Sequence, residues 1–581
     1  MLVFEIDDEW REMLEYIRIN NAEPPKTGEG AIAPSYAKMN MQPLVDKLRS
    51  ADMIVREAVG NEQKFFYCLV SISEKRQKAV AEVMGDGALR LRLKKKDDMG
   101  NTIKNGGGWT GFKQHLSHLY ERSSEGSLFS SSQQQQIMMF MLNDVDERAM
   151  GPQLIQKEAC ELGNTPMEQL IVDDRIVTYY CLHHEKKLAW MERNWMLNYT
   201  GKQPIETIRE YFGEEIAMQC VFTGYIAKSL WVPAAIGIVL FFIQIVLMAE
   251  KRDIDNPWEM LYAIYIAIWT VQLSAGWKSL QLVYELEWGT VDIEVTETDR
   301  PEFLQNPRTY KRLNTVSKRE EFFPDPLWRG VSVVVTLVVF IILTGINVSV
   351  VMGLEVAKAL LNQQLGESGH VFVKIVGAVL QAACIQAFRL GLIPVFDWLT
   401  YQENWKLMSE YNASMAAKRM CFGFFNSYFA IIFVMLLANE VKVFGVDISC
   451  PGHKCMGYVE VLLGIIFVQQ SVIRFGLKTI RPYYAWQALE DAELEHERNT
   501  ATEPRQQHEK EYKLSEMPTL ELEYASKVLE LGYFCLFGAS FPMMAIFVLF
   551  ATLVEIRGSG KSCVLPSLPH KLWSSDKSSS S

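Results

Sequence analysis

Seven long apolar stretches lie between residues 229 and 554, and they constrain the fold more than any other feature of this 581-residue chain. They cover residues 229–249, 258–277, 331–356, 371–390, 420–438, 457–476 and 528–554. A helix rises about 1.5 Å per residue, so stretches of this length can cross about 30 Å of hydrocarbon. The sequence therefore predicts a polytopic α-helical membrane protein, with about seven or eight helices over residues 221–560.

The last stretch carries Pro542 at its centre. Proline lacks a backbone N–H and clashes with the preceding turn of a helix. We therefore expect this stretch to form either one kinked helix or two short helices that meet inside the membrane.

Residues 1–220 contain no such stretch. Residues 65–73 are aromatic and β-branched, as in a buried strand, residues 74–84 have the pattern of a helix, and residues 88–94 alternate like a half-exposed strand. This order predicts an α+β domain over residues 1–220. Residues around 98–135 contain NGGGW and SSSQQQQ, and we expect low-complexity loops there. Residues 561–581 are rich in serine and are expected to form a polar tail.

Charge and targeting signals narrow the function classes. The net charge of −11 argues against nucleic acid as a partner. The N-terminus lacks a basic region followed by a long apolar run, so we expect no cleavable signal peptide and a cytosolic N-terminal domain. No Ser/His/Asp arrangement, histidine-rich cluster or nucleotide motif accompanies the apolar stretches, which weakens an enzymatic reading.

The basic loops predict the orientation of the helices. Basic residues gather after the second stretch (Lys278, Arg300, Arg308, Lys311, Arg312, Lys318, Arg319) and after the sixth (Lys478, Arg481, Arg498, Arg505, Lys510, Lys513). The loops assigned outward carry fewer, such as Lys358 after the third stretch. The positive-inside rule thus agrees with a cytosolic N-terminus. It places Cys450 and Cys455 outside the cytosol, where either a disulfide or two free thiols is consistent with their spacing.

Polar residues interrupt three of the stretches. Lys374, Gln381, Gln386 and Arg389 fall within about 140° of one helix face in the fourth stretch. Ionisable groups in a bilayer normally face a bundle interior or a water-filled cavity. Lys374 and Arg389 lie near the two ends, where snorkelling to the membrane surface is an alternative explanation. That explanation does not extend to the two glutamines, which lie deep in the stretch.

The sixth stretch carries a cationic face. Gln470, Arg474, Lys478 and Arg481 recur at helical spacing on one face less than about 90° wide. Such a face attracts anions, whether chloride or lipid phosphate, although ordinary positive-inside flanking is the alternative. Asn426 in the fifth stretch adds another polar group. Together these residues predict a hydrophilic groove within the membrane.

Several motifs resemble the anoctamin family in order. They are QPIETIREYFGEEIA at 203–217, WVP at 231–233, YELEWGT at 284–290, RPEF at 300–303, Leu399-Thr400 with Glu403-Asn404, FFNSY at 424–428, CPGHKCM at 450–456 and residues 532–557. The resemblance covers roughly residues 130–560. It implies a passive chloride channel or phospholipid scramblase, with a ferredoxin-like cytosolic domain. It also implies a homodimer of ten-helix subunits, each with its own groove between helices 3 and 7.

Calcium activates many anoctamins through carboxylates on helices 6, 7 and 8. The helix 7 pair falls here on Glu523 and Ser526, and the helix 8 pair on Glu555 and Ser559. The helix 6 positions fall near residues 475–476 and 478–479, where no carboxylate stands. Ca²⁺ takes six to eight oxygen ligands, so we expect calcium dependence to be lost or weakened. Lys478 is a candidate for a tethered cation that pairs with Glu523 or Glu555; the alternative is that it only flanks the membrane.

The family's last two helices have no counterpart after Glu555, so the chain resembles a C-terminally shortened anoctamin. The last helix builds much of the family's dimer interface, which leaves assembly open. The sequence therefore predicts passive movement of anions, lipid headgroups or both, with a non-conducting membrane tether or regulatory subunit as the alternative.

Overall fold

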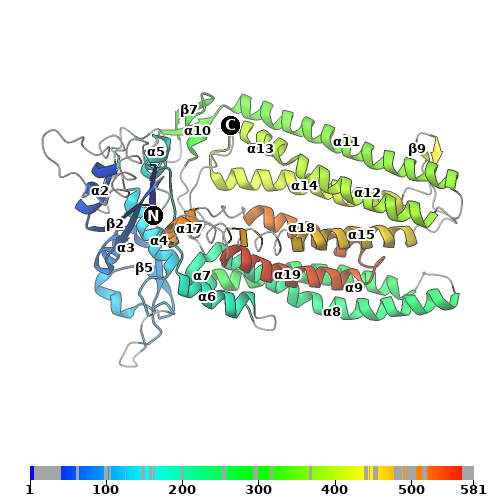
Figure 1. Cartoon of the computed structure of the whole chain (residues 1–581), viewed down its shortest axis with the longest axis horizontal. Coiled ribbons are helices and arrows are strands. Elements are labelled where there is room, and N and C mark those ends of the chain that lie inside the picture. Colours follow the sequence, from blue (N-terminus) through cyan, green and yellow to red (C-terminus); the bar gives the residue numbers. More distant parts are fainter. Residues whose placement is uncertain are drawn as a thin grey trace.

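The computed structural model describes residues 1–5, 41–59, 65–96, 102–103, 106–124, 126–144, 151–155, 160, 164–173, 175–197, 202–251, 257–291, 299–314, 318, 320–365, 370–436, 442–443, 445–448, 456–476, 480, 484, 487–488, 491, 506–512 and 520–564. A small sheet region lies at one end of the molecule, and a bundle of long helices extends away from it (Figure 1).

A four-stranded antiparallel sheet forms the N-terminal region. Its strands are β1 (Leu2–Glu5), β2 (Met53–Val59), β3 (Phe65–Ile72) and β6 (Thr178–Tyr179), in the order β2-β3-β1-β6. Alternate residues of β3 face opposite sides. Phe66 and Cys68 join the core formed with helices α2 (Met41–Ser50) and α3 (Glu74–Ala88), whereas Tyr67 packs with Val3 and Tyr180.

The predicted strand at 65–73 and helix at 74–84 are confirmed. The strand predicted at 88–94 forms β4 (Arg90–Arg92), but it pairs with β5 (Trp109–Gly111) in a separate two-stranded ribbon. The remaining helical elements of this region are a 3₁₀ turn at Gln114–Leu119, α4 (Ser131–Leu142), α5 (Pro166–Val172), α6 (Glu185–Met191), a π-helical turn at Glu192–Met196 and α7 (Ile205–Phe212).

The expectation of low-complexity loops around 98–135 is wrong for β5, the 3₁₀ turn and the start of α4. Ser130 and Gln133 form a capping box at the start of α4, in which each side chain accepts a hydrogen bond from the other residue's backbone N–H. Serine is a favoured N-cap, glutamine is a good helix former, and Ile137 and Met141 are buried. The polar composition therefore describes the first turn of a helix that packs on the core.

Long helices make up most of the described part of residues 214–564. They are α8 (Glu214–Lys251), α9 (Pro257–Trp288), α11 (Pro326–Leu365), α12 (His370–Gly391), α13 (Ile393–Gln402), α14 (Met408–Leu436), α15 (Met456–Phe475), α18 (Leu520–Phe537) and α19 (Met544–Val564). Within the described residues, five spans are long and apolar enough to cross a membrane: Glu214–Leu247, Trp258–Trp288, Pro326–Leu365, Phe372–Gln402 and Met408–Leu436. Val459–Ile473 is a shorter apolar helix.

The first six predicted stretches are helical where the structure describes them. The last stretch is broken in two, because a turn that contains Pro542 separates α18 from α19. One expectation needs correction: α11 continues past residue 356 to Leu365, so Lys358 lies inside a helix and not in a loop. The sequence also did not predict α13 as a separate helix.

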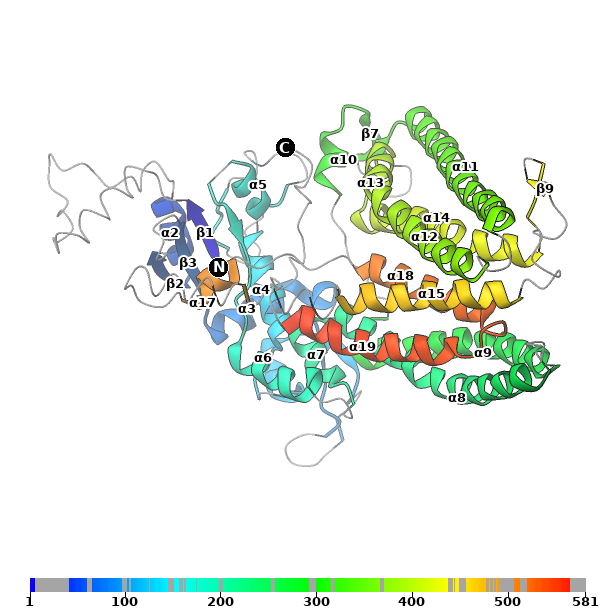
Figure 2. The same ribbon diagram turned by 45° about the vertical axis from the view of Figure 1, so that its right-hand side comes forward.

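The short elements that connect the long helices lie at the two ends of the bundle. Helix α10 (Pro301–Gln305), the ribbon of β7 (Thr309–Leu313) and β8 (Glu320–Pro324), and helix α17 (Gln507–Tyr512) lie toward the N-terminal sheet (Figure 1). Strands β9 (Lys442–Val443) and β10 (Val446–Asp447) lie at the opposite end (Figure 1). Helices α15 and α18 run between the layer of α11, α12 and α14 and the layer of α8, α9 and α19 (Figure 2). The bundle core is rich in aromatic side chains, among them Tyr428, Phe467 and Phe534.

Candidate functional site

The four polar residues predicted on α12 have different environments. Gln381 is 0% exposed and lies on the face that packs into the bundle core with Ala378 and Ile385. Lys374 and Gln386 are half-buried, and Arg389 is exposed. Within the described part of the chain, neither amide atom of Gln381 has a hydrogen-bond partner. Gln381 is therefore the most deeply buried member of this predicted face, and Arg389 is the most exposed.

Asn426 on α14 lies close to the same part of α12. Its Nδ2 donates to the backbone carbonyl of Ile385 at 2.8 Å, one helical turn from Gln381. Its Oδ1 is buried and has no partner among the described residues. Burying an amide without its hydrogen bonds costs about 1–3 kcal/mol by mutational data. The packing of the core does not require the amides of Gln381 and Asn426 on these facing helices. We therefore consider them candidates for a functional role.

Gln470 on α15 is half-buried and hydrogen-bonded to the hydroxyl of Tyr533 on α18. The same hydroxyl donates to the Ser427 carbonyl of α14 at 3.2 Å. Helices α12 and α15 also pack against each other. Four helices thus bring Gln381, Asn426, Gln470 and Tyr533 into one bundle interior, with the polar groups packed between helices.

The structure does not cover every predicted site residue. Lys478, Cys450 and Cys455 lie outside the described residues, and so does the side chain of Arg474. The cationic face of the sixth stretch, the tethered-cation role of Lys478 and the disulfide therefore stay predictions.

Polar residues on α11 belong to the same interior and were missed from the sequence. Asn347 is 1% exposed, and Glu355 and Lys358 are 4% and 8% exposed. Lys358 Nζ donates to Glu355 Oε1 at 2.6 Å, and its side chain lies against Gly377 of α12. The spacing of residues 347, 351, 355 and 358 marks one helix face, a signal that could have found them.

A buried cluster of charged side chains, centred on Lys527, joins α18 to α19. Lys527 Nζ donates to Glu530 Oε2 at 2.8 Å and lies 2.9 Å from Glu555 Oε2. It also donates to Thr552 Oγ1 at 2.6 Å. The Lys527 side chain is 3% exposed. Glu555, one of the two expected calcium ligands, is therefore paired with a lysine of the neighbouring helix.

Glu523, the other expected ligand, accepts a hydrogen bond from Gln219 Nε2 of α8. Across the described ranges, no group of three or more His, Cys, Asp and Glu residues is arranged to hold a metal ion. The two carboxylates predicted to bind calcium are thus each engaged by a nitrogen donor of this chain.

A second buried polar cluster holds the elbow between α13 and α14. Glu403 Oε2 accepts hydrogen bonds from Lys418 Nζ and from Trp405 Nε1, both at 2.7 Å. Lys418 also donates to Ser414 Oγ at 2.6 Å. Glu403 belongs to one of the sequence motifs described above, and its contacts explain that motif by local structure.

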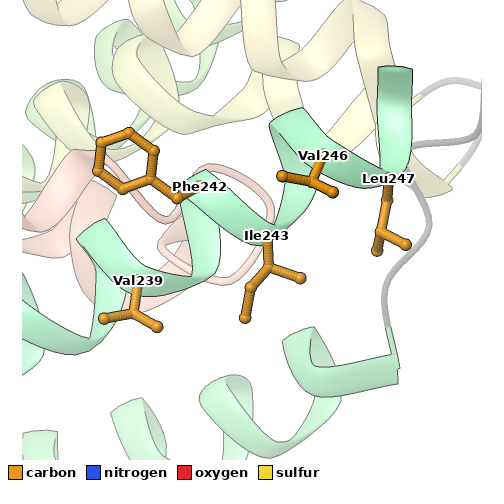
Figure 3. Close-up of a pocket in the computed structure, with 5 residues that line it drawn as sticks. All are labelled: Val239, Phe242, Ile243, Val246 and Leu247. Atoms are coloured by element: carbon orange, nitrogen blue, oxygen red, sulfur yellow. The ribbon is translucent and has the colours of Figure 1, made fainter. Parts of the chain in front are cut away.

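A concavity of about 400 Å³ lies on α8, away from these polar residues. Its lining is Val239, Phe242, Ile243, Val246 and Leu247 (Figure 3). An apolar lining offers no ligand to an ion and suits hydrocarbon. It is therefore not a candidate for an ion path.

Comparison with known proteins shows which family this chain resembles. The family model described as "Anoctamin: Calcium-activated chloride channel" matches residues 208–565. Human anoctamin-8 is 24% identical over 351 residues, which are 58% of this chain and 27% of that protein. Mouse anoctamin-5 is 23% identical over 530 residues, covering 77% of this chain and 57% of that protein. Human anoctamin-1 is 20% identical over 561 residues, covering 78% and 55%. The chain thus spans between about a quarter and somewhat over half of these relatives.

Proposed function

Because the chain belongs to the anoctamin family and is an integral membrane protein, we propose that it is a passive transport protein for chloride or other anions, phospholipid headgroups, or both. The path is a hydrophilic groove bounded by α11, α12, α14, α15 and α18, the helices that correspond to the third to seventh apolar stretches of the sequence. Membrane lipids and small anions are its partners. The description of the matched family model, a calcium-activated chloride channel, supports the chloride part of this proposal at the level of the family.

The observation that carries the groove is Gln381. It is 0% exposed at the middle of a membrane helix, and its amide has no partner among the described residues. Polar groups inside a membrane bundle are costly and usually mark a substrate path. Asn426 and Gln470 on the neighbouring helices supply further hydrogen-bonding groups, and Lys374 and Arg389 on α12 favour anions over cations.

Reconstituted liposomes test this proposal with two assays, chloride efflux and labelled-lipid flipping. The Gln381→Leu variant removes the amide and keeps a similar volume. We expect the flux to fall at least about tenfold, equivalent to about 1.4 kcal/mol in the barrier. Gln272→Leu is the matched control, because Gln272 is an exposed amide within the α9 span. It should leave the flux unchanged.

The two assays also separate the alternatives. Loss of chloride efflux alone would identify an anion channel, and loss of lipid flipping would identify a scramblase. A wild-type protein that moves neither solute would favour a non-conducting tether or regulatory subunit. Flux that is equal in wild type and Gln381→Leu would remove Gln381 from the path.

We also propose a ferredoxin-like topology and a cytosolic location for the N-terminal region. The antiparallel order β2-β3-β1-β6, with α2 before β2 and α3 after β3, supports the topology. Strand β7, which carries Lys311 and Arg312, lies at the sheet end of the bundle (Figure 1), and the positive-inside rule assigns that end to the cytosol. A homodimer remains part of this proposal on family grounds.

A further inference from the structure

Lys527 is a buried cation whose donors are matched by acceptors. A lysine ammonium has three N–H donors. Here the three acceptors are Glu530, one turn along α18, and Glu555 and Thr552 on α19. Thr552 in turn donates to the Val548 carbonyl at 2.7 Å, which orients its oxygen toward the ammonium. The cluster is therefore built around a positive charge at a fixed position.

Because Glu530 and Glu555 are buried, the packing of α18 against α19 depends on the positive charge of Lys527. Glu530 and Glu555 are 4% and 5% exposed. Two carboxylates held this close together out of water repel each other, and removing one partner of a buried ion pair leaves an uncompensated charge. A cation between them is required if both are to stay ionised.

A calcium ion does not fit these residues as they stand. Ca²⁺ needs six to eight oxygen ligands at 2.3–2.6 Å. Both acidic residues of the cluster already contact an ammonium, at 2.8 and 2.9 Å. A divalent ion at the same place would meet a positive charge and not a coordination shell. Glu523, which could have contributed a ligand, accepts a hydrogen bond from Gln219.

We propose that the Lys527 ammonium is a built-in cation that takes the place of a calcium ion and holds α18 against α19 permanently. Helices α18 and α19 then need no metal ion from solution to stay packed together. For transport this means activity without calcium, and that consequence rests on the function proposed above. The structural claim itself concerns only ion binding and stability, so it can be tested separately.

Thermal unfolding of the purified full-length protein tests it, with and without about 10 µM free calcium, a range typical of sensor sites. Wild type should unfold at the same temperature in both conditions. Lys527→Gln leaves two carboxylates, a hydroxyl and an amide oxygen facing one another. Its midpoint should fall by about 5 °C without calcium and recover when calcium is added.

Lys358→Gln is the matched control, because Lys358 is another buried lysine paired with a glutamate three residues away, Glu355. It should lower the midpoint without any recovery in calcium. The double variant Lys527→Gln/Glu555→Gln should also lose the recovery, because one carboxylate is gone. Terbium luminescence of Lys527→Gln and wild type gives a second readout, with binding expected only in the variant.

Two results would overturn the proposal. One is a Lys527→Gln protein that is as insensitive to calcium as wild type. The other is a wild-type protein that calcium stabilises in a manner lost in Glu555→Gln. Neither result depends on chloride or lipid flux, so the proposal for Lys527 can be tested even if the protein transports neither. Conversely, failure of the calcium test leaves the Gln381 flux experiment unaffected.

Discussion

Gly532 on α18 lets the side chain of Tyr428 on α14 lie directly against the α18 backbone. A Cβ atom at position 532 would lie 2.1 Å from Tyr428 Oη. That hydroxyl donates to the Leu529 carbonyl of α18 at 2.5 Å. The absence of a side chain thus permits both the close approach of the two helices and the hydrogen bond between them.

Gly532→Ala should lower the free energy of unfolding by about 1–3 kcal/mol, because the Tyr428 hydroxyl must move and the Leu529 carbonyl loses its donor. Gly353 on α11 is the control, since a Cβ there meets nothing within 4 Å. Gly353→Ala should be neutral or more stable by up to about 1 kcal/mol. Thermal unfolding of both variants measures the difference, and equal destabilisation would contradict the packing argument.

At the scale of elements, α17 ties the segment between α15 and α18 to the N-terminal sheet. Tyr180 donates its hydroxyl hydrogen to the His508 carbonyl, and the His183 backbone N–H donates to Glu511. The His508 ring lies 4.7 Å from the Tyr67 ring of β3, between ring centroids. Burial, opposed by the nearby Glu509 carboxylate, lowers the pKa of the His508 imidazole below its ordinary value.

This pKa shift predicts that α17 loosens in acid. In the unfolded segment the imidazole has a pKa of about 6.5, above that of the docked state. The docked state therefore has its full stability above about pH 6.5 and loses it as the pH falls through that value toward the docked pKa. Hydrogen exchange of residues 507–512, corrected for intrinsic rates, should be faster at about pH 5.5 than at pH 7.5.

His508→Phe removes the titrating group and keeps a ring against Tyr67. Burial raises the pKa of Glu511, so its contribution has the opposite sign: it is present at low pH and lost as the pH rises above its ordinary range. In His508→Phe, docking should therefore tighten and not loosen in acid. Unchanged acid loosening in this variant would exclude His508 as its cause.

At the scale of the whole molecule, the N-terminal region attaches to the bundle at the end of α9. Trp109 Nε1 donates to the Glu287 carbonyl at 3.1 Å, and Arg90 Nη1 donates to the Val291 carbonyl at 3.2 Å. Gly289, within the YELEWGT motif, has a φ of +72° and lies under the Trp109 ring. Glycine reaches this conformation without strain, and here it also leaves space for the indole.

Gly289→Ala should detach the N-terminal region from α9, because a Cβ would lie 2.2 Å from Trp109 Cγ. Gly445→Ala separates backbone strain from steric overlap with a neighbouring side chain. Gly445 has a φ of +79°, but nothing lies within 4 Å of its Cβ position. Backbone strain of about 1 kcal/mol applies to both variants, and overpacking of about 1–3 kcal/mol only to Gly289→Ala. Faster proteolysis of the N-terminal region in Gly289→Ala alone would confirm the attachment; similar rates in both would refute it.

The structure shows that Pro542 lies between two helices, a choice that the sequence left open. The apolar helices, an interruption at Pro542 and the family could be inferred from the amino-acid sequence alone. These are local properties: a span needs about 20 apolar residues, and proline interrupts a helix wherever it stands. It also identified Gln381 and Asn426 as polar residues in apolar surroundings, which the structure places on facing helices. The sequence did not predict that the Ser/Gln run begins a helix, because Ile137 and Met141 become buried only when the region folds.

The pairing of buried charges follows from how the helices pack and could not be inferred from the sequence. Lys527 stands beside Ser526 in the sequence, and nothing local indicates that it binds Glu555 of the next helix. In the same way, α17 contacts residues more than 300 positions earlier in the chain. The physical reason is that hydropathy and helix propensity act over a few residues, whereas ion pairs depend on which helix faces the fold brings together.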